Sequence, residues 1–87
     1  MNKYFVKVEV KLKPLVLDPQ GKAVSSALHN LGSEEVQNTR IGKLIELNIE
    51  DESEENVRKS VTEMCNKLLA NTVIEDYSIN ISEEENA

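Results

Sequence analysis

The stretch YFVKVEVKL, residues 4–12, alternates between two kinds of side chain. Its even-numbered residues are tyrosine, valine or leucine, whereas the odd-numbered residues after Phe5 are charged. Successive side chains of a β-strand point to opposite faces of a sheet, so this period of two predicts a strand with one buried and one solvated face. The remaining elements can be placed around this strand.

A first helix is predicted to follow the strand. Asp18 suits the N-cap position and Pro19 the first helical position, because proline has no N–H to leave unpaired there. Gly32 stands where a left-handed C-terminal cap requires glycine. Between them, apolar residues recur at helical spacing: Ala23, Val24, Ala27, Leu28 and Leu31. This pattern predicts a helix that ends near Gly32 and packs one face against the sheet.

A hairpin is expected after this helix. A weaker strand near residues 35–41 would lead through a turn at Gly42-Lys43 into a strand over residues 44–50, where apolar and polar side chains alternate. The second helix is then predicted to begin after an N-cap at Ser53 and to end near Ala70. Its apolar stripe consists of Val57, Val61, Met64, Cys65, Leu68 and Leu69. A last strand carries Tyr77, Ile79 and Ile81 on one face.

The order of these elements predicts the fold class. Strand, helix, strand, strand, helix, strand is the ferredoxin-like βαββαβ pattern of the α+β class, with an antiparallel sheet and two helices on one face. We expect a single domain over residues 1–82 and a disordered acidic tail over residues 83–87.

The sheet face without helices is expected to be partly covered by a second subunit. If the first strand lies antiparallel to residues 44–50, lysines oppose glutamates on this face, and such exposed pairs contribute only about 0.2–1 kcal/mol each. Phe5 and Leu44 are its apolar exceptions, which favours contact with another chain. Together with Lys7 and Glu46 they are the candidate dimer surface.

Composition excludes several classes of function. The chain has 87 residues and a formal charge of −6, which opposes binding to nucleic acid. No apolar run approaches the roughly 20 residues that a membrane span requires, and no secretory signal opens the chain, so a cytoplasmic location is expected. One cysteine and one histidine cannot supply an internal disulfide or a four-ligand zinc site.

No catalytic, cofactor or metal site is predicted. Cys65 lies within the apolar stripe of the second helix, where a buried thiol is inert. His29 lies off the stripe of the first helix and is expected on the surface. The carboxylates fall in exposed runs, and the sequence has no phosphate-binding loop or dinucleotide fingerprint.

Two segments carry more specific signals. The segment LDPQGKA, residues 17–23, places a glycine in the first helical turn, where it costs roughly 1 kcal/mol of helix stability relative to alanine. Either this cost is tolerated beside the cap, or the glycine allows the close approach of another backbone at a docking surface. In RIGK, residues 40–43, basic residues flank a glycine, and this segment is either a plain turn or a basic contact site. The candidate partner-contact residues are Asp18, Pro19, Gln20, Gly21, Lys22, Arg40, Gly42 and Lys43.

These two segments carry a family resemblance. With IEL at residues 45–47, MCNKLLAN at residues 64–71 and VIEDY at residues 73–77, they closely resemble the PurS family, the small subunit of phosphoribosylformylglycinamidine synthase of de novo purine synthesis. The similarity extends from Tyr4 to Ile81. Thr72 departs from it, because the family typically has proline there, and this relaxes the backbone after the second helix.

The resemblance implies an assembly role. The family's small subunit forms homodimers or a higher oligomer and joins a glutaminase subunit to a synthetase subunit, so that ammonia from glutamine converts formylglycinamide ribonucleotide to formylglycinamidine ribonucleotide with ATP hydrolysis. ATP and magnesium would then belong to the synthetase subunit. The alternative is a regulatory domain whose paired ferredoxin-like modules bind an amino acid.

Overall fold

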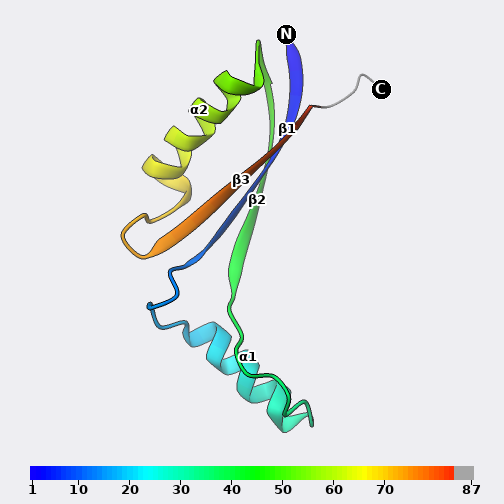
Figure 1. Ribbon diagram of the computed structural model, residues 1–87, viewed down its shortest axis with the longest axis vertical. Coiled ribbons are helices and arrows are strands. Elements are labelled where there is room, and N and C mark those ends of the chain that lie inside the picture. Colours follow the sequence, from blue (N-terminus) through cyan, green and yellow to red (C-terminus); the bar gives the residue numbers. More distant parts are fainter. Residues whose placement is uncertain (84–87) are drawn as a thin grey trace.

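A three-stranded antiparallel sheet is the centre of the molecule. The computed structural model describes residues 1–83, and its strand order is β2-β1-β3. The elements are β1 (Asn2–Leu12), α1 (Pro19–Asn30), β2 (Gly42–Asp51), α2 (Glu54–Met64), the π-helical segment η1 (Cys65–Leu69) and β3 (Glu75–Glu83). Helix α2 lies against the sheet, whereas α1 lies beyond its end (Figure 1).

The apolar residues that alternate along β1 lie in the core, as predicted. Four of its even-numbered residues, Tyr4, Val6, Val8 and Val10, are buried, and Val8 lies opposite Ile45 of β2 and Ile79 of β3. A shift of the register by one residue would turn all of these side chains to solvent, so burial fixes the pairing. The predicted antiparallel pairing of β1 with the strand after Gly42 is confirmed, including Lys7 opposite Glu46 and Lys3 opposite Glu50.

Helix α2 covers this core. The Ser53 hydroxyl accepts a hydrogen bond from the Asn56 amide, as predicted for the N-cap, and Glu54 and Glu55 favour the positive end of the helix dipole. Val57 and Val61 of α2 and Cys65 at the start of η1 lie one turn apart, and all three are buried in one core cluster with the β1 residues.

The end of the second helix differs from the prediction. Over η1 the backbone bonds from residue i to i+5, and the Ala70 amide donates to the Cys65 carbonyl. This wider turn rotates the following side chains relative to an α-helix. Leu68, expected on the buried stripe, is therefore 82% exposed, while Ala70 is buried.

The expected strand over residues 35–41 is absent. This segment runs back along α1, where its polar backbone groups bond to side chains: the Val36 carbonyl to His29 and the Ile41 amide to Asp18. Because no strand precedes it, Gly42-Lys43 is not a hairpin turn but the start of β2, with Gly42 paired to Lys11. The hairpin prediction is therefore wrong, and the sheet within residues 1–83 has three strands.

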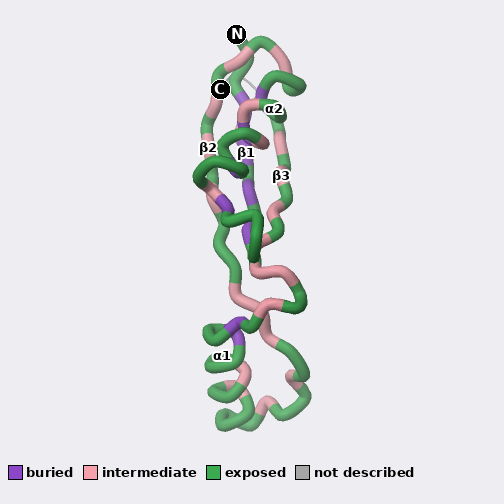
Figure 2. Tube along the Cα trace, turned by 90° about the vertical axis from the view of Figure 1, so that its left-hand side faces the viewer, coloured by how far each residue is buried: buried purple, intermediate pink, exposed green. Residues whose placement is uncertain are grey.

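The expected place of α1 on the sheet is also wrong. The α+β class with an antiparallel sheet and two helices is confirmed, but only α2 covers the sheet (Figures 1 and 2). Helix α1 begins at Pro19 after the Asp18 cap and is followed by Gly32 at φ 101°, as predicted. Its apolar residues Val24 and Leu31 are 38% and 83% exposed, because no sheet lies beside them.

The tail boundary moves by one residue. Glu83 is the last residue of β3, so the strand includes the first position of the predicted tail, and residues 84–87 lie outside the described part of the chain. Residues 1–83 contain no helix long and apolar enough to cross a membrane.

We predict that Val8→Ala lowers the free energy of unfolding by about 2 kcal/mol, because it removes two methyl groups and leaves a cavity at the centre of the sheet. The same substitution at Val73, which is 80% exposed, should change it by less than about 0.5 kcal/mol. Urea unfolding measures both values, and equal effects would contradict the assignment of the core.

Candidate functional site

The start of α1 and the start of β2 are tied together by one carboxylate. Asp18 is only 5% exposed. Its Oδ1 accepts a hydrogen bond from the Gly21 amide at 2.9 Å, and its Oδ2 accepts one from the Ile41 amide at 2.8 Å. The same side chain therefore caps the helix and holds the segment that returns from the helix to the sheet. We call Asp18, Gly21, Arg40 and Ile41 the clasp.

Arg40 ties the loop between β1 and α1 into the clasp. Its Nη2 donates to three carbonyl oxygens, those of Leu12 at 3.3 Å, Lys13 at 2.9 Å and Val16 at 3.2 Å. Its Nε lies 3.9 Å from Asp18 Oδ2. The guanidinium fork presents several donors in fixed directions, which suits a loop whose carbonyls converge on one point. Arg40 is thus a structural residue of this chain, not the tip of a turn.

The clasp stabilises the ionised form of Asp18. The hydrogen bond from the Ile41 amide, and after it the bond from the Gly21 amide, holds the pKa of the Asp18 carboxyl below its ordinary value of 3.8, and the positive charge of Arg40 acts in the same direction. The carboxylate therefore stays ionised at neutral pH and is not a proton donor there.

Close approach of a backbone explains the glycine in the first turn of α1. A Cβ at Gly21 would collide with the carbonyl oxygen of Thr39, which belongs to the returning segment of the same chain. A Cβ at Gly42 would lie 2.6 Å from the Val10 carbonyl oxygen of the neighbouring strand. Both glycines are therefore required by contacts inside the chain, and contact with a partner subunit remains a prediction for them.

Four of the eight candidate contact residues have side chains that the clasp leaves at the surface. Pro19, Gln20, Lys22 and Lys43 are exposed, and the structure brings them around the clasp at the junction of α1 and the sheet. Gln20, Gly42 and Lys43 line a cavity there together with Asp18 and Ile41, and its lining also includes Lys11 and Glu75. The junction is thus a surface with two lysine side chains above an internally paired Asp-Arg unit.

The open sheet face has the predicted register and little apolar area. Lys7 lies opposite Glu46, and its Nζ lies 5.6 Å from the centre of the Phe5 ring. Phe5 is half-buried, whereas Leu44 is 55% exposed. The predicted role of this face in a dimer is not tested by the single chain.

The expected burial of Cys65 and the expected exposure of His29 are confirmed. Cys65 is fully buried in the core, and burial raises the pKa of its thiol. His29 is exposed, and its Nε2 lies 2.7 Å from the Val36 carbonyl oxygen. Among residues 1–83 there is no group of three or more His, Cys, Asp or Glu side chains that could hold a metal ion.

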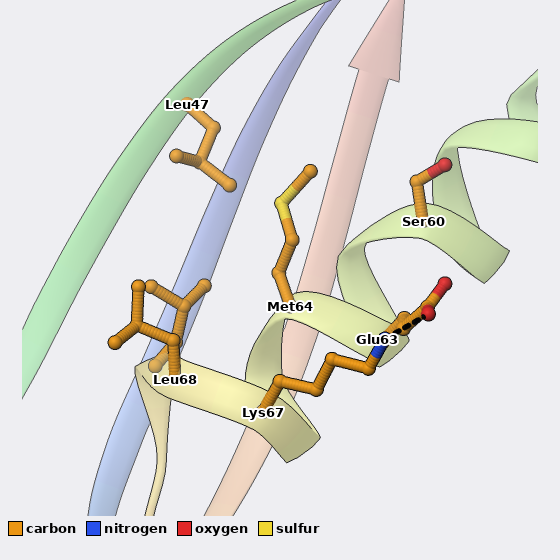
Figure 3. Close-up of a pocket in the computed structure, with 7 residues that line it drawn as sticks. Leu47, Ser60, Glu63, Met64, Lys67 and Leu68 are labelled. Atoms are coloured by element: carbon orange, nitrogen blue, oxygen red, sulfur yellow. Dashed lines mark hydrogen bonds and ion pairs between the residues drawn. The ribbon is translucent and has the colours of Figure 1, made fainter.

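A groove beside α2 was not predicted from the sequence. This groove, of about 580 Å³, lies between β2 and the end of the second helix (Figure 3). Its lining is mostly apolar and consists of Leu47, Ser60, Glu63, Met64, Lys67, Leu68 and Leu69. The α-helical period of apolar residues predicted that Leu68 lies in the core. No pattern in the sequence predicted the π-helical turn that places Leu68 at the groove instead.

Comparison with known proteins relates the chain to one family. The PurS family, described as phosphoribosylformylglycinamidine (FGAM) synthase, matches residues 5–83. The PurS subunit of this synthase from Bacillus subtilis is 58% identical over 80 residues, which are 92% of this chain and 94% of that protein.

Two solved structures are similar to this chain over nearly its whole length. PurS of Methanocaldococcus jannaschii, described as one of the subunits of formylglycinamide ribonucleotide amidotransferase, superposes with a TM-score of 0.85 at 44% identity, over 94% of this chain and 99% of that one. A chain in the structure of PurLQS from Thermotoga maritima gives a TM-score of 0.87 at 29% identity, over 94% of this chain and 100% of that one. Superpositions of this extent include α1.

We predict that Asp18→Asn loosens the clasp in a pH-dependent way. Asparagine keeps one acceptor but presents an N–H₂ group to an amide donor, so the Gly21 and Ile41 amides should exchange hydrogen at least several-fold faster at pH 6. The pKa of Asp18 is lowered in the folded chain, so the carboxylate stabilises the clasp above about pH 3.8, and this contribution is lost as the pH falls through the folded value.

The ratio of exchange rates between variant and wild type should therefore shrink as the pH falls below 3.8. Amide exchange followed by NMR at several pH values measures it. A ratio that stays constant down to pH 2 would contradict the role of the ionised carboxylate.

We predict that Gly21→Ala destabilises α1, although alanine normally stabilises a helix by about 1 kcal/mol relative to glycine. The added methyl group meets the Thr39 carbonyl, so the returning segment must move. Amide exchange of α1 should accelerate, whereas Ser26→Ala, at an exposed position of the same helix, should leave it unchanged or slower. Slower exchange in Gly21→Ala would contradict the close approach.

Proposed function

The chain belongs to the PurS family and is a small subunit of phosphoribosylformylglycinamidine synthase, and we propose that it acts in that enzyme as a non-catalytic adaptor. It would join the glutaminase subunit to the synthetase subunit, so that ammonia released from glutamine reaches formylglycinamide ribonucleotide. The product would be formylglycinamidine ribonucleotide, with ATP hydrolysed in the same reaction.

The observation that carries this proposal is the likeness to a chain of PurLQS from Thermotoga maritima. That chain is covered over its full length, and the structure that contains it is described as that of PurLQS. This chain supplies the sheet, the covering helix and the projecting α1 in the same arrangement. A protein whose first helix, α1, is held away from its own sheet has surfaces on two sides with which to contact other subunits.

The titratable groups of the chain support a role without catalysis. Within residues 1–83, the two groups with a shifted pKa serve the fold: Asp18 binds two backbone amides, and Cys65 lies in the core. A catalytic acid, base or nucleophile needs a shifted pKa together with access to a substrate, which neither residue combines. In this proposal ATP and magnesium are bound by the synthetase subunit, and the complex works in the cytoplasm.

The proposed contact surface is the junction around the clasp. Lys22 and Lys43 are exposed there, on a chain whose formal charge is −6, and a basic site of this kind favours a partner surface that carries carboxylates. Asp18, Gly21, Arg40 and Gly42 would position this surface through their contacts within the chain, while Pro19 and Gln20 contribute exposed atoms. The open sheet face with Phe5, Lys7, Leu44 and Glu46 stays a proposed contact between copies of the chain.

We predict that the chain is required for glutamine-dependent but not for ammonia-dependent synthesis. The test is reconstitution with the glutaminase and synthetase subunits from the same source, with formation of formylglycinamidine ribonucleotide as the readout. Omission of the chain should abolish the activity with glutamine and leave the activity at high ammonia concentration. Loss of both activities would contradict the adaptor role.

A pair of charge reversals tests the surface in the same assay. Lys22→Glu with Lys43→Glu should lower the glutamine-dependent activity at limiting concentration of this chain at least tenfold, and excess chain should restore it, because only association is weakened. Lys59→Glu, an equal reversal on α2, is the matched control and should have little effect. A thermal shift with added amino acids, in the absence of the other subunits, would instead support the regulatory alternative.

A further inference from the structure

A polar cavity lies between α1 and the returning segment, residues 35–41, which runs back beside the helix (Figures 1 and 2). Its volume is about 390 Å³, which falls within the range of about 300–1,000 Å³ found for small-molecule sites. We call it the α1 cavity. Helix α1 supplies Gly21, Lys22, Ser25, Ser26 and His29 to its lining, and the returning segment supplies residues 37–39.

Most polar side chains of the α1 cavity are not engaged by the chain itself. His29 is bonded to the Val36 carbonyl. Within residues 1–83, no hydrogen bond or ion pair involves the side chain of Lys22, Ser25, Ser26, Gln37, Asn38 or Thr39. An ammonium group, three hydroxyls and two amides from two segments of the chain therefore line one space with their donors available to a ligand.

The two walls of the α1 cavity are held at a fixed distance by contacts within the chain. In the first turn of the helix, Gly21 allows the close approach of the Thr39 carbonyl. Two turns later, His29 Nε2 donates a hydrogen bond of 2.7 Å to the Val36 carbonyl oxygen. Because both ends of the cavity are tied in this way, a ligand would bind between walls that are already in place, and little ordering of the backbone would oppose its binding.

The charge of the lining favours an anion. Residues 1–83 contribute no carboxylate to the α1 cavity, although the chain has a formal charge of −6. By comparison, the cavity at the clasp is lined by Asp18 and Glu75, and the groove beside α2 by Glu63. An amino acid would bring an ammonium group, for which the α1 cavity offers no carboxylate partner. The ammonium group of Lys22 and the neighbouring hydroxyls instead suit an anion with several acceptor oxygens.

We propose that the α1 cavity binds a phosphorylated sugar. The phosphate oxygens accept hydrogen bonds from Lys22, Ser25 and Ser26 on the helix. The amides of Gln37 and Asn38 each carry both a donor and an acceptor, which suits the hydroxyl groups of a sugar. Inorganic phosphate alone would leave these amides and much of the volume unused. Binding of this ligand goes beyond the adaptor role and does not depend on it.

An NMR titration of the ¹⁵N-labelled full chain at constant ionic strength tests this site. Ribose 5-phosphate is the probe, because it is the part that the substrate and the product of the proposed reaction share. We expect it to shift the amide signals of residues 22–29 and 37–39 saturably, with a dissociation constant of about 1 mM or less. Ribose alone and inorganic phosphate alone should each bind at least fivefold more weakly.

Three results of this titration would overturn the proposal. The first is the absence of a saturable shift in residues 22–29 and 37–39, and the second is a saturable shift confined to other residues. The third is an equal dissociation constant for ribose 5-phosphate and inorganic phosphate, because the sugar would then make no contact.

A lysine substitution separates a defined site from general attraction of anions. Lys22→Gln should raise the dissociation constant of ribose 5-phosphate at least tenfold, because it removes the cation that faces the phosphate. Lys59→Gln makes the same change of charge at an exposed position of α2 and is the matched control, with an expected change of less than twofold. Equal weakening by both substitutions would show that the net charge of the chain, not the α1 cavity, attracts the ligand, and would overturn the proposal.

A carboxylate placed in the α1 cavity gives an independent measure on the opposite wall. Asn38→Asp should weaken binding at least tenfold through repulsion of the phosphate, and because Asn38 is exposed the fold should be kept. Asn48→Asp, at an exposed position of β2 opposite Phe5, is the control and should change the dissociation constant less than twofold. If ribose 5-phosphate does not bind while the reconstituted complex keeps its glutamine-dependent activity, the ligand site fails and the adaptor function stands.

Discussion

The shape of this molecule depends on the Asp18 carboxylate, whose two oxygens accept hydrogen bonds from an amide in the first turn of α1 and from an amide of the segment that returns to the sheet. Both oxygens of the ionised carboxylate are strong acceptors, and the two amides favour this form by lowering its pKa. Arg40 adds further hydrogen bonds, since its guanidinium donates to three carbonyl oxygens of the loop that leads into the helix. Together they fix the direction in which α1 leaves the sheet.

That direction decides what the chain can do. With α1 held away, the core consists of one sheet face and one helix, and eight hydrophobic residues of the described chain are buried. The separation leaves apolar surface exposed on α1, at Val24 and Leu31, and the groove beside α2 is not covered by that helix. A subunit that leaves such surfaces open is suited to assembly, which agrees with its membership of a family that includes a chain of PurLQS.

Sequence reasoning succeeded where a periodic pattern and its environment agree. The alternation over residues 4–12 predicted the buried valines and the register against β2, since any slip would expose the valines. It failed over residues 35–41, where the backbone bonds to Asp18 and His29 side chains instead of to a neighbouring strand. It also failed at Leu68, because one π-helical turn rotates a side chain that the α-helical period places in the core.

Features that depend on local chemistry could be predicted from the residues: the strand with one apolar face, the Asp18 and Ser53 caps, the glycine after α1 and the buried Cys65. The family resemblance could be recognised as well. For Gly21, the close approach of a backbone was one of two readings, and only the folded chain shows that this backbone is that of Thr39 in the same chain. The position of α1 apart from the sheet is likewise visible only in the folded chain. Amphipathic spacing predicts that a helix has an apolar face. The direction of that face is determined by the long-range hydrogen bonds of Asp18 and Arg40.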